Sequence, residues 1–169
     1  MNLVPKQIWK ENYSYYSTKS IEDFKNDLKE LLAKTGRFWD FSTNLTGGFI
    51  SENEFELTPK WQLVYFRPHG SVSYLNGQII SDKIGTVIKF TVTPNWIFPF
   101  LILILPITTI IIFIATRKIQ TDKNGIIGEA TMLFILPAVT YLFCNLTKRA
   151  IKNRFINYFK LTELPKTSF

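Results

Sequence analysis

The sequence predicts a soluble α+β domain, an antiparallel β-meander with one helix, fused to a transmembrane hairpin of two helices. Residues 96–115 form an uncharged apolar run of twenty residues, about the length that a helix needs to cross the hydrocarbon core of a bilayer. A second apolar run covers residues 126–146. Residues 37–93 instead contain short apolar or alternating runs separated by turn-forming residues, a pattern typical of antiparallel strands.

Charge divides the chain in the same way. Residues 1–95 carry eleven Lys or Arg and ten Asp or Glu, whereas residues 96–169 carry nine and three. The positive excess flanks the apolar runs, as the positive-inside rule and lipid headgroups favour, and does not indicate a nucleic-acid partner. We expect three regions: a β-rich domain at residues 1–95, the hairpin at residues 96–147 with spans at about 96–115 and 126–146, and a basic amphipathic tail at residues 148–169.

Residues 21–34 predict the helix of the domain. Ser20 is a suitable N-cap, and Asp23 follows it at the spacing of a capping motif. Apolar residues recur at helical spacing on one face: Ile21, Phe24, Leu28, Leu31 and Leu32. We expect this face to cover the sheet. A helix lying on a membrane is the weaker alternative, because the polar face is acidic.

Six short runs between residues 37 and 93 predict four to six strands. Alternation is clearest in the last run, where Ile88 and Phe90 fall on the opposite side from Val87 and Lys89. Residues 1–18 mix aromatic and charged side chains and predict a short strand or an irregular arm. The six runs are residues 37–42, 47–50, 54–57, 60–66, 71–80 and 84–92.

The last strand and the first span are separated only by Pro94 and Asn95. The sheet should therefore lie close to the headgroups, with Trp96 as an interface anchor. Pro106 should kink the first span, and residues 116–125 predict a tight polar turn. After the second span an amphipathic segment is expected either at the interface or against the domain, its apolar face formed by Ile151, Phe155, Tyr158 and Phe159.

A series of short motifs precedes the apolar hairpin: G-x-I at Gly48, N-x-F-x-L at Asn53, then Arg67, G-x-I at Gly77 and G-T-x-I at Gly85. Over about residues 46–116 this series resembles a group of small uncharacterised bacterial membrane proteins that have two spans and a β-rich N-terminal domain. In that group the arginine is often followed by Asn-Ser, whereas here Pro-His follows it. The resemblance implies a bacterial source and this architecture, and it implies no activity.

Glu129 is the only acidic residue in either predicted span. An acidic residue inside a bilayer is costly and often belongs to a proton or ion site. We expect a structural role instead, because Glu129 lies in the first turn of its helix, where a carboxylate is favourable. There it can pair with Arg117 or Lys118 across the hairpin turn.

The sequence contains no recognisable catalytic, metal-binding or cofactor motif. His69 is the only histidine and Cys144 the only cysteine, so a metal cluster and an intrachain disulfide both lack partners. Glu52, Glu54 and Glu56 alternate on a strand and could bind a cation or a basic partner, although such residues more often form the wet face of a half-buried strand. We therefore expect no enzyme activity, no cofactor and no metal.

Two functions of different classes fit this interpretation. The first is a membrane-tethered binding or scaffold module that recruits a protein, peptide or small ligand through its sheet. The alternative is a ligand-sensing effector whose spans oligomerise and alter permeability. Both describe a multi-pass protein of the cell membrane whose partners are the lipid bilayer and a protein or small ligand, with self-association left open. Seven basic residues beside the outer ends of the hairpin, against three in its turn, predict cytoplasmic N- and C-termini.

Overall fold

The computed structural model describes residues 9–34, 45–59, 71–82, 85–116 and 131–164. The chain divides into two units: unit 1 is Met1–Pro94 with Thr147–Phe169, and unit 2 is Asn95–Leu146. The described elements, in chain order, are β1 (Glu11–Ser17), α1 (Ile21–Ala33), β2 (Leu45–Phe49), β3 (Glu54–Pro59), β4 (Ser73–Ser81), β5 (Thr86–Pro94), α2 (Ile97–Thr116), the π-helix η1 (Thr131–Ile135), α4 (Leu136–Phe159) and β6 (Thr162–Glu163).

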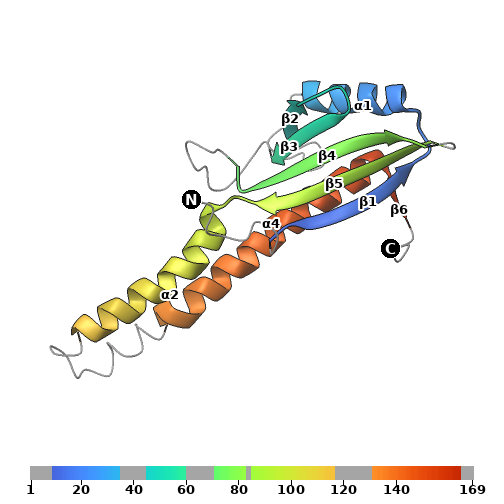
Figure 1. Cartoon of the computed structure of the whole chain (residues 1–169). Coiled ribbons are helices and arrows are strands. Elements are labelled where there is room, and N and C mark those ends of the chain that lie inside the picture. Colours follow the sequence, from blue (N-terminus) through green and yellow to red (C-terminus); the bar gives the residue numbers. More distant parts are fainter. Residues whose placement is uncertain (1–8, 35–44, 60–70, 83–84, 117–130, 165–169) are drawn as a thin grey trace. The chain divides into compact units, whose positions relative to one another are not determined.

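Unit 1 contains an antiparallel sheet with the strand order β2-β3-β4-β5-β1-β6 (Figure 1). Strands β2 to β5 form a meander, in which each strand pairs with the next along the chain. β1 then pairs with β5, from Glu11 opposite Val92 to Ser17 opposite Thr86, and β6 pairs with β1. The N-terminal strand therefore lies inside the sheet. The predicted strands at residues 37–42 and 60–66 lie outside the described residues.

The hydrophobic core of unit 1 lies between the sheet and its two helices, α1 and the later turns of α4. The ring of Phe155 on α4 lies 5.6 Å from that of Phe55 and 5.2 Å from that of Phe90, measured between centroids. Phe24 of α1 lies 4.6 Å from Phe159 of α4. All five rings are buried, so the removal of apolar surface from water holds these layers together. The sequence predicts the segment after the second apolar run either at the membrane interface or against the domain. In the structure it packs against the sheet.

α1 forms where its apolar spacing predicts a helix. The Ser20 side chain accepts a hydrogen bond of 3.2 Å from the backbone N–H of Asp23 and caps the first turn. Leu28 and Leu31 are fully buried in the core of unit 1. The apolar face of α1 therefore covers the sheet and does not lie on a membrane.

Unit 2 consists of α2, η1 and the first turns of α4. Phe98 of α2 packs on Phe143 of α4 with ring centroids 5.6 Å apart, and Phe98 and Cys144 are buried. Pro106 lies inside α2. Three residues further on, the Thr109 hydroxyl donates a hydrogen bond of 2.8 Å to a backbone carbonyl of the preceding turn, so the hydroxyl finds its partner within the helix.

The predicted transmembrane hairpin is wrong. Within the residues that the structure describes, no helix combines the length and the apolar character that crossing a membrane requires. The second predicted span is not a separate element, because α4 continues past Leu146 to Phe159 and its later turns carry four basic residues and pack on the sheet. The same finding overturns the two-span fold, the multi-pass location in the cell membrane and the orientation with cytoplasmic termini. The polar turn predicted between the spans falls almost entirely in residues 117–130, outside the described part.

Candidate functional site

Unit 2 exposes an unusual amount of apolar side chain. Among the described residues, every exposed large apolar side chain except Ile50 belongs to this unit. Ile111 and Ile114 of α2 are 60% and 67% exposed. Folded monomers rarely leave a large contiguous apolar patch in water, so such a patch marks an interaction surface. Six exposed apolar residues of α2 recur at helical spacing and form a strip along one side, namely Phe100, Leu103, Ile107, Ile110, Ile111 and Ile114. Ile112 is 55% exposed and lies off this strip.

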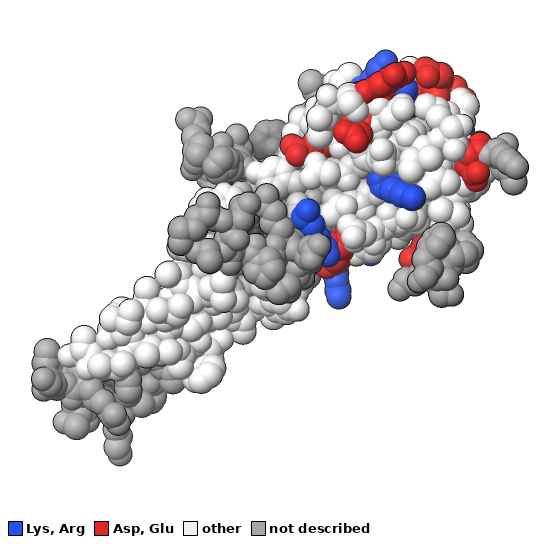
Figure 2. All heavy atoms as spheres, viewed as in Figure 1, with Lys and Arg blue, Asp and Glu red and all other residues white. Residues whose placement is uncertain are grey.

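The other helical part of unit 2 is exposed and apolar on more than one side. Its exposed side chains are Phe134, Ile135, Leu136, Val139, Tyr141, Leu142 and Leu146. Residues 95–116 and 131–146 contain no Asp, Glu, Lys or Arg. In Figure 2 the described atoms of this unit are accordingly white, and blue and red atoms lie on unit 1. The described residues of unit 2 therefore contribute no charged rim of the kind that surrounds many protein–protein interfaces.

A cluster of charged and aromatic residues joins β1 to α4 in unit 1. Lys148 Nζ donates a hydrogen bond to the Glu11 carboxylate, which also accepts one from the Tyr13 hydroxyl. The Lys148 side chain is 5% exposed and that of Glu11 is 40% exposed. Lys152 Nζ lies 4.5 Å from the centre of the Tyr13 ring, a cation–π contact. The cluster therefore fixes the first turn of α4 within unit 1 to the first strand of the sheet.

The protonation of this cluster follows from its contacts. Burial by itself raises the pKa of Glu11, but the hydrogen bonds from Lys148 and Tyr13 and the positive charges of Lys148 and Lys152 outweigh it and hold the pKa below its ordinary value. Burial and the hydrogen bond to Glu11 raise the pKa of the Tyr13 hydroxyl. At neutral pH Glu11 is therefore a carboxylate that compensates the buried charge of Lys148.

The sheet face opposite the helices is polar. Strand pairing places two rows of side chains across it: Glu54, Gln78, Lys89 and Ser14 in one row, and Glu56, Asn76, Thr91 and Asn12 in the next. A shallow hollow of about 450 Å³ lies along these strands. Of the three alternating acids predicted to share a face, Glu54 and Glu56 lie here, whereas Glu52 precedes β3 and pairs with Lys25 of α1 at 3.8 Å. This face offers amides, hydroxyls and charges to a polar partner.

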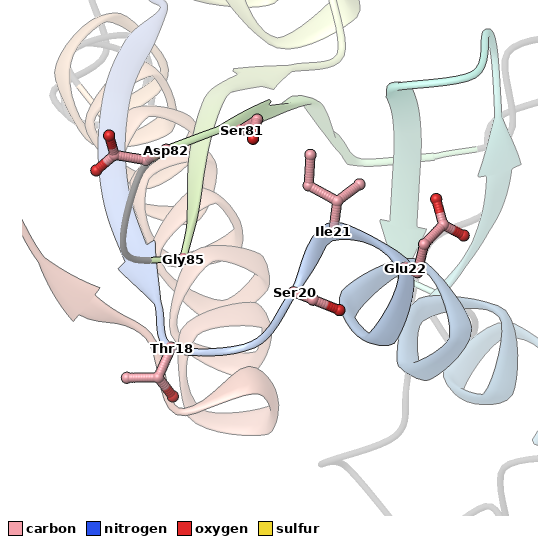
Figure 3. Close-up of a pocket in the computed structure, with 7 residues that line it drawn as sticks. All are labelled: Thr18, Ser20, Ile21, Glu22, Ser81, Asp82 and Gly85. Atoms are coloured by element: carbon pink, nitrogen blue, oxygen red, sulfur yellow. The ribbon is translucent and has the colours of Figure 1, made fainter.

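A second hollow, of about 430 Å³, lies beside the first turn of α1 and the β4–β5 hairpin. Figure 3 shows that the carboxylates of Glu22 and Asp82 point away from each other, with the apolar side chain of Ile21 between them in this view. Across the described ranges, no group of three or more His, Cys, Asp or Glu residues could hold a metal ion. The hollow therefore does not gather the side chains that metal binding or acid–base catalysis needs.

Most of the site residues predicted from the sequence belong to segments that the structure does not describe. These are the residues of the expected hairpin pair, Glu129 with Arg117 or Lys118, so that pairing stays a prediction. His69, for which the sequence predicts no site, also lies outside the described residues. Trp96 is described: it directly precedes α2, is 60% exposed, and contacts Phe100 edge to face with ring centroids 6.1 Å apart. Its role as an anchor in a lipid interface also stays a prediction.

The sequence pattern misses the cluster around Glu11. Glu11 and Tyr13 are two residues apart, so a strand places them on the same face, and that part of the cluster has a local signal. Lys148 is 137 residues from Glu11. From the sequence alone it is only one of the basic residues that follow the second apolar run. Local spacing cannot identify a partner at that distance.

Comparisons with known proteins do not extend this picture. No family model matches the chain, and no match was found among curated proteins or among solved structures. The resemblance to small bacterial two-span proteins accordingly stays a prediction.

Proposed function

We propose that the chain is a lipid-attached binding module. Its apolar unit 2 contacts lipid acyl chains, and the open polar face of the sheet in unit 1 binds a protein, peptide or small ligand. The observation that carries the proposal is the concentration of exposed apolar side chains in unit 2. Contact with acyl chains does not require a helix to cross the bilayer.

The free energy for attachment comes from the strip on α2 and from the exposed residues of η1 and α4. Fully burying one Ile, Leu or Phe side chain contributes roughly 1.5–3 kcal/mol. Several side chains of this kind lie along one helix, and lipid binding grows with the apolar area that is buried. Partial insertion of the strip is therefore sufficient for stable attachment.

The chemistry of unit 2 favours lipid over a second copy of the chain. Protein–protein interfaces combine an apolar centre with a polar rim. The described part of unit 2 has no charged residue and exposes apolar side chains on both of its helical parts. A partner that covers one side would leave the other sides in water, whereas acyl chains can cover them all.

The experiment measures partition of the full chain, purified in mild detergent, onto vesicles of neutral phosphatidylcholine by flotation. The test variant is the double substitution Ile107→Lys with Ile111→Lys, which places two charges on the strip. The matched control is Ile50→Lys, because Ile50 is 65% exposed but lies in unit 1. A lysine at an apolar depth of a bilayer costs up to about 3 kcal/mol, so we expect the double variant to lose at least about tenfold in partition.

The wild-type chain and the Ile50→Lys control should both float with the vesicles. The proposal is wrong if, after the detergent is removed, the wild-type chain stays in the dense fraction as a monomer. It is also wrong if the chain forms a stable dimer that does not bind vesicles. Release of a dye trapped in the same vesicles would point to the alternative function, an effector that alters permeability. A retained dye together with flotation supports the binding module.

A further inference from the structure

We infer that the exposed basic residues at the start of the unit 1 part of α4 bind the headgroups of anionic lipids. This inference rests on the proposed attachment of unit 2 to lipid, and it specifies which lipids the chain prefers. Two described residues make up the surface, which we call the basic collar: Arg149 and Lys152.

The order of residues along α4 supports the collar. α4 is one continuous helix from Leu136 to Phe159. It is uncharged as far as Leu146, where an exposed apolar side chain lies, and basic residues follow within the next turns. Arg149 is exposed and Lys152 is partly exposed. The cationic side chains of the collar therefore follow the last exposed apolar residue of unit 2 within two turns of the same helix, the order in which basic residues flank lipid-contacting segments.

The charge of the collar is not cancelled within the described part of the chain. α4 contains no Asp or Glu. The charge of Lys152 also acts on Glu11, but that carboxylate is already engaged by Lys148 and by the Tyr13 hydroxyl. Lys152 also contacts the Tyr13 ring, which leaves its positive charge intact. Among the described residues, the ion pairs that the structure contains include none formed by Arg149 or Lys152.

The adjoining apolar helix distinguishes a lipid headgroup from other anions. A nucleic acid or a free phosphate would use the positive charges and leave the apolar turns before them in water. An anionic lipid supplies acyl chains for the apolar turns and a phosphate for the basic residues that follow them. Each Lys or Arg near an anionic membrane surface contributes about 1 kcal/mol to binding, so the two residues of the collar predict a clear preference for anionic vesicles.

The test compares binding of the full chain to vesicles of pure phosphatidylcholine and to vesicles that contain phosphatidylserine as well. The collar variant is Arg149→Gln with Lys152→Gln. The matched control, Lys29→Gln with Lys160→Gln, removes the same charge from exposed positions on α1 and directly after α4. We expect the collar variant to bind phosphatidylserine vesicles about 30-fold more weakly than wild type at low salt, and to bind neutral vesicles unchanged. The control should match wild type on both.

The outcomes separate this inference from the proposed function. Wild-type binding to neutral vesicles with no gain from phosphatidylserine would refute the basic collar and leave the attachment of unit 2 intact. Absence of binding to neutral vesicles would refute the attachment. Raising the salt concentration should reduce only the gain from phosphatidylserine, because screening acts on charges. If inorganic phosphate at the concentration of the headgroups displaces the chain from the anionic vesicles, the collar is a site for free anions and the lipid inference fails.

Discussion

Replacing Glu11 by Gln should weaken the folded state of unit 1 through a defined physical cause. The substitution keeps the shape of the side chain but removes the carboxylate that compensates Lys148. Lys148 would then remain 5% exposed with a positive charge and no anionic partner on β1. Desolvation of an unpaired charge is costly, so the free energy of unfolding should fall.

The contacts between Glu11 and Lys148 determine how far the free energy of unfolding should fall. Removing one partner of a fully buried ion pair costs about 3–5 kcal/mol, because the other charge is left buried. The Glu11 side chain is 40% exposed, so water already reaches this pair and can solvate part of the remaining charge. A hydrogen bond to a charged group contributes about 1.5–3 kcal/mol. We therefore expect Glu11→Gln to lower the free energy of unfolding by about 1–3 kcal/mol.

Denaturant unfolding of the full chain in mild detergent, followed by circular dichroism, measures this change. The control is Glu22→Gln, because Glu22 is 80% exposed in an ion pair of 3.8 Å, and such a pair contributes at most about 1 kcal/mol. A double-mutant cycle with Lys148→Met isolates the coupling, for which we expect at least about 1 kcal/mol. A coupling near zero, with Glu11→Gln as stable as wild type, would refute the reasoning.

The pH dependence gives an independent check on the same pair. The pKa of Glu11 is lowered in the folded state from its ordinary value of 4.5. The stabilisation is therefore fully present above the unfolded pKa and is lost as the pH falls through the folded one. Wild type should lose more stability than Glu11→Gln as the pH falls below about 4.5, and the two curves should converge in acid. Parallel curves would show that Glu11 does not titrate as the structure requires.

Three further substitutions test the packing of unit 1 by the same unfolding measurement. Leu28→Asp should unfold the sheet unit or cost more than about 4 kcal/mol, because Leu28 is fully buried and the new charge has no partner; retained melting behaviour would show that α1 does not cover the core. Gly77→Ala should cost about 1–3 kcal/mol, since a Cβ there would lie 2.2 Å from the Phe55 ring; an unchanged midpoint would contradict that contact. Ser20→Ala should cost about 1 kcal/mol through loss of the α1 cap, while Ser20→Thr should restore most of it.

The elements that the sequence predicts well are those with local signals. For α1, a capping residue and an apolar spacing of three and four residues appear within fourteen positions, and the helix occupies Ile21–Ala33. β4 and β5 alternate clearly between a buried and an exposed face. In each case the signal lies within a few turns of helix or within one strand, so it can be recognised from the local sequence pattern.

The place of β1 in the sheet has no such signal. Its partner, β5, lies far along the chain, since the paired residues Tyr13 and Phe90 are 77 positions apart. Aromatic residues occur on both faces of β1, at Tyr15 and at Tyr16, which weakens the alternation that marks a strand. Pairing between distant strands depends on which edge of the meander is free after it forms, and the local pattern of residues 1–18 does not contain that information.

The error at α4 arises because a change in residue composition does not by itself mark the end of a helix. The apolar residues up to Leu146 and the basic residues from Lys148 onward are typical of a span and its flank, and they divide the helix in two by hydropathy. A helix ends where the backbone is broken, and α4 contains no Pro or Gly after Pro137. Ile151, Phe155 and Phe159 instead continue at a spacing of four and are buried in the core of unit 1. One continuous helix therefore supplies apolar surface to unit 2 and core residues to unit 1, and the buried Lys148 lies where its environment changes, which is why it needs Glu11.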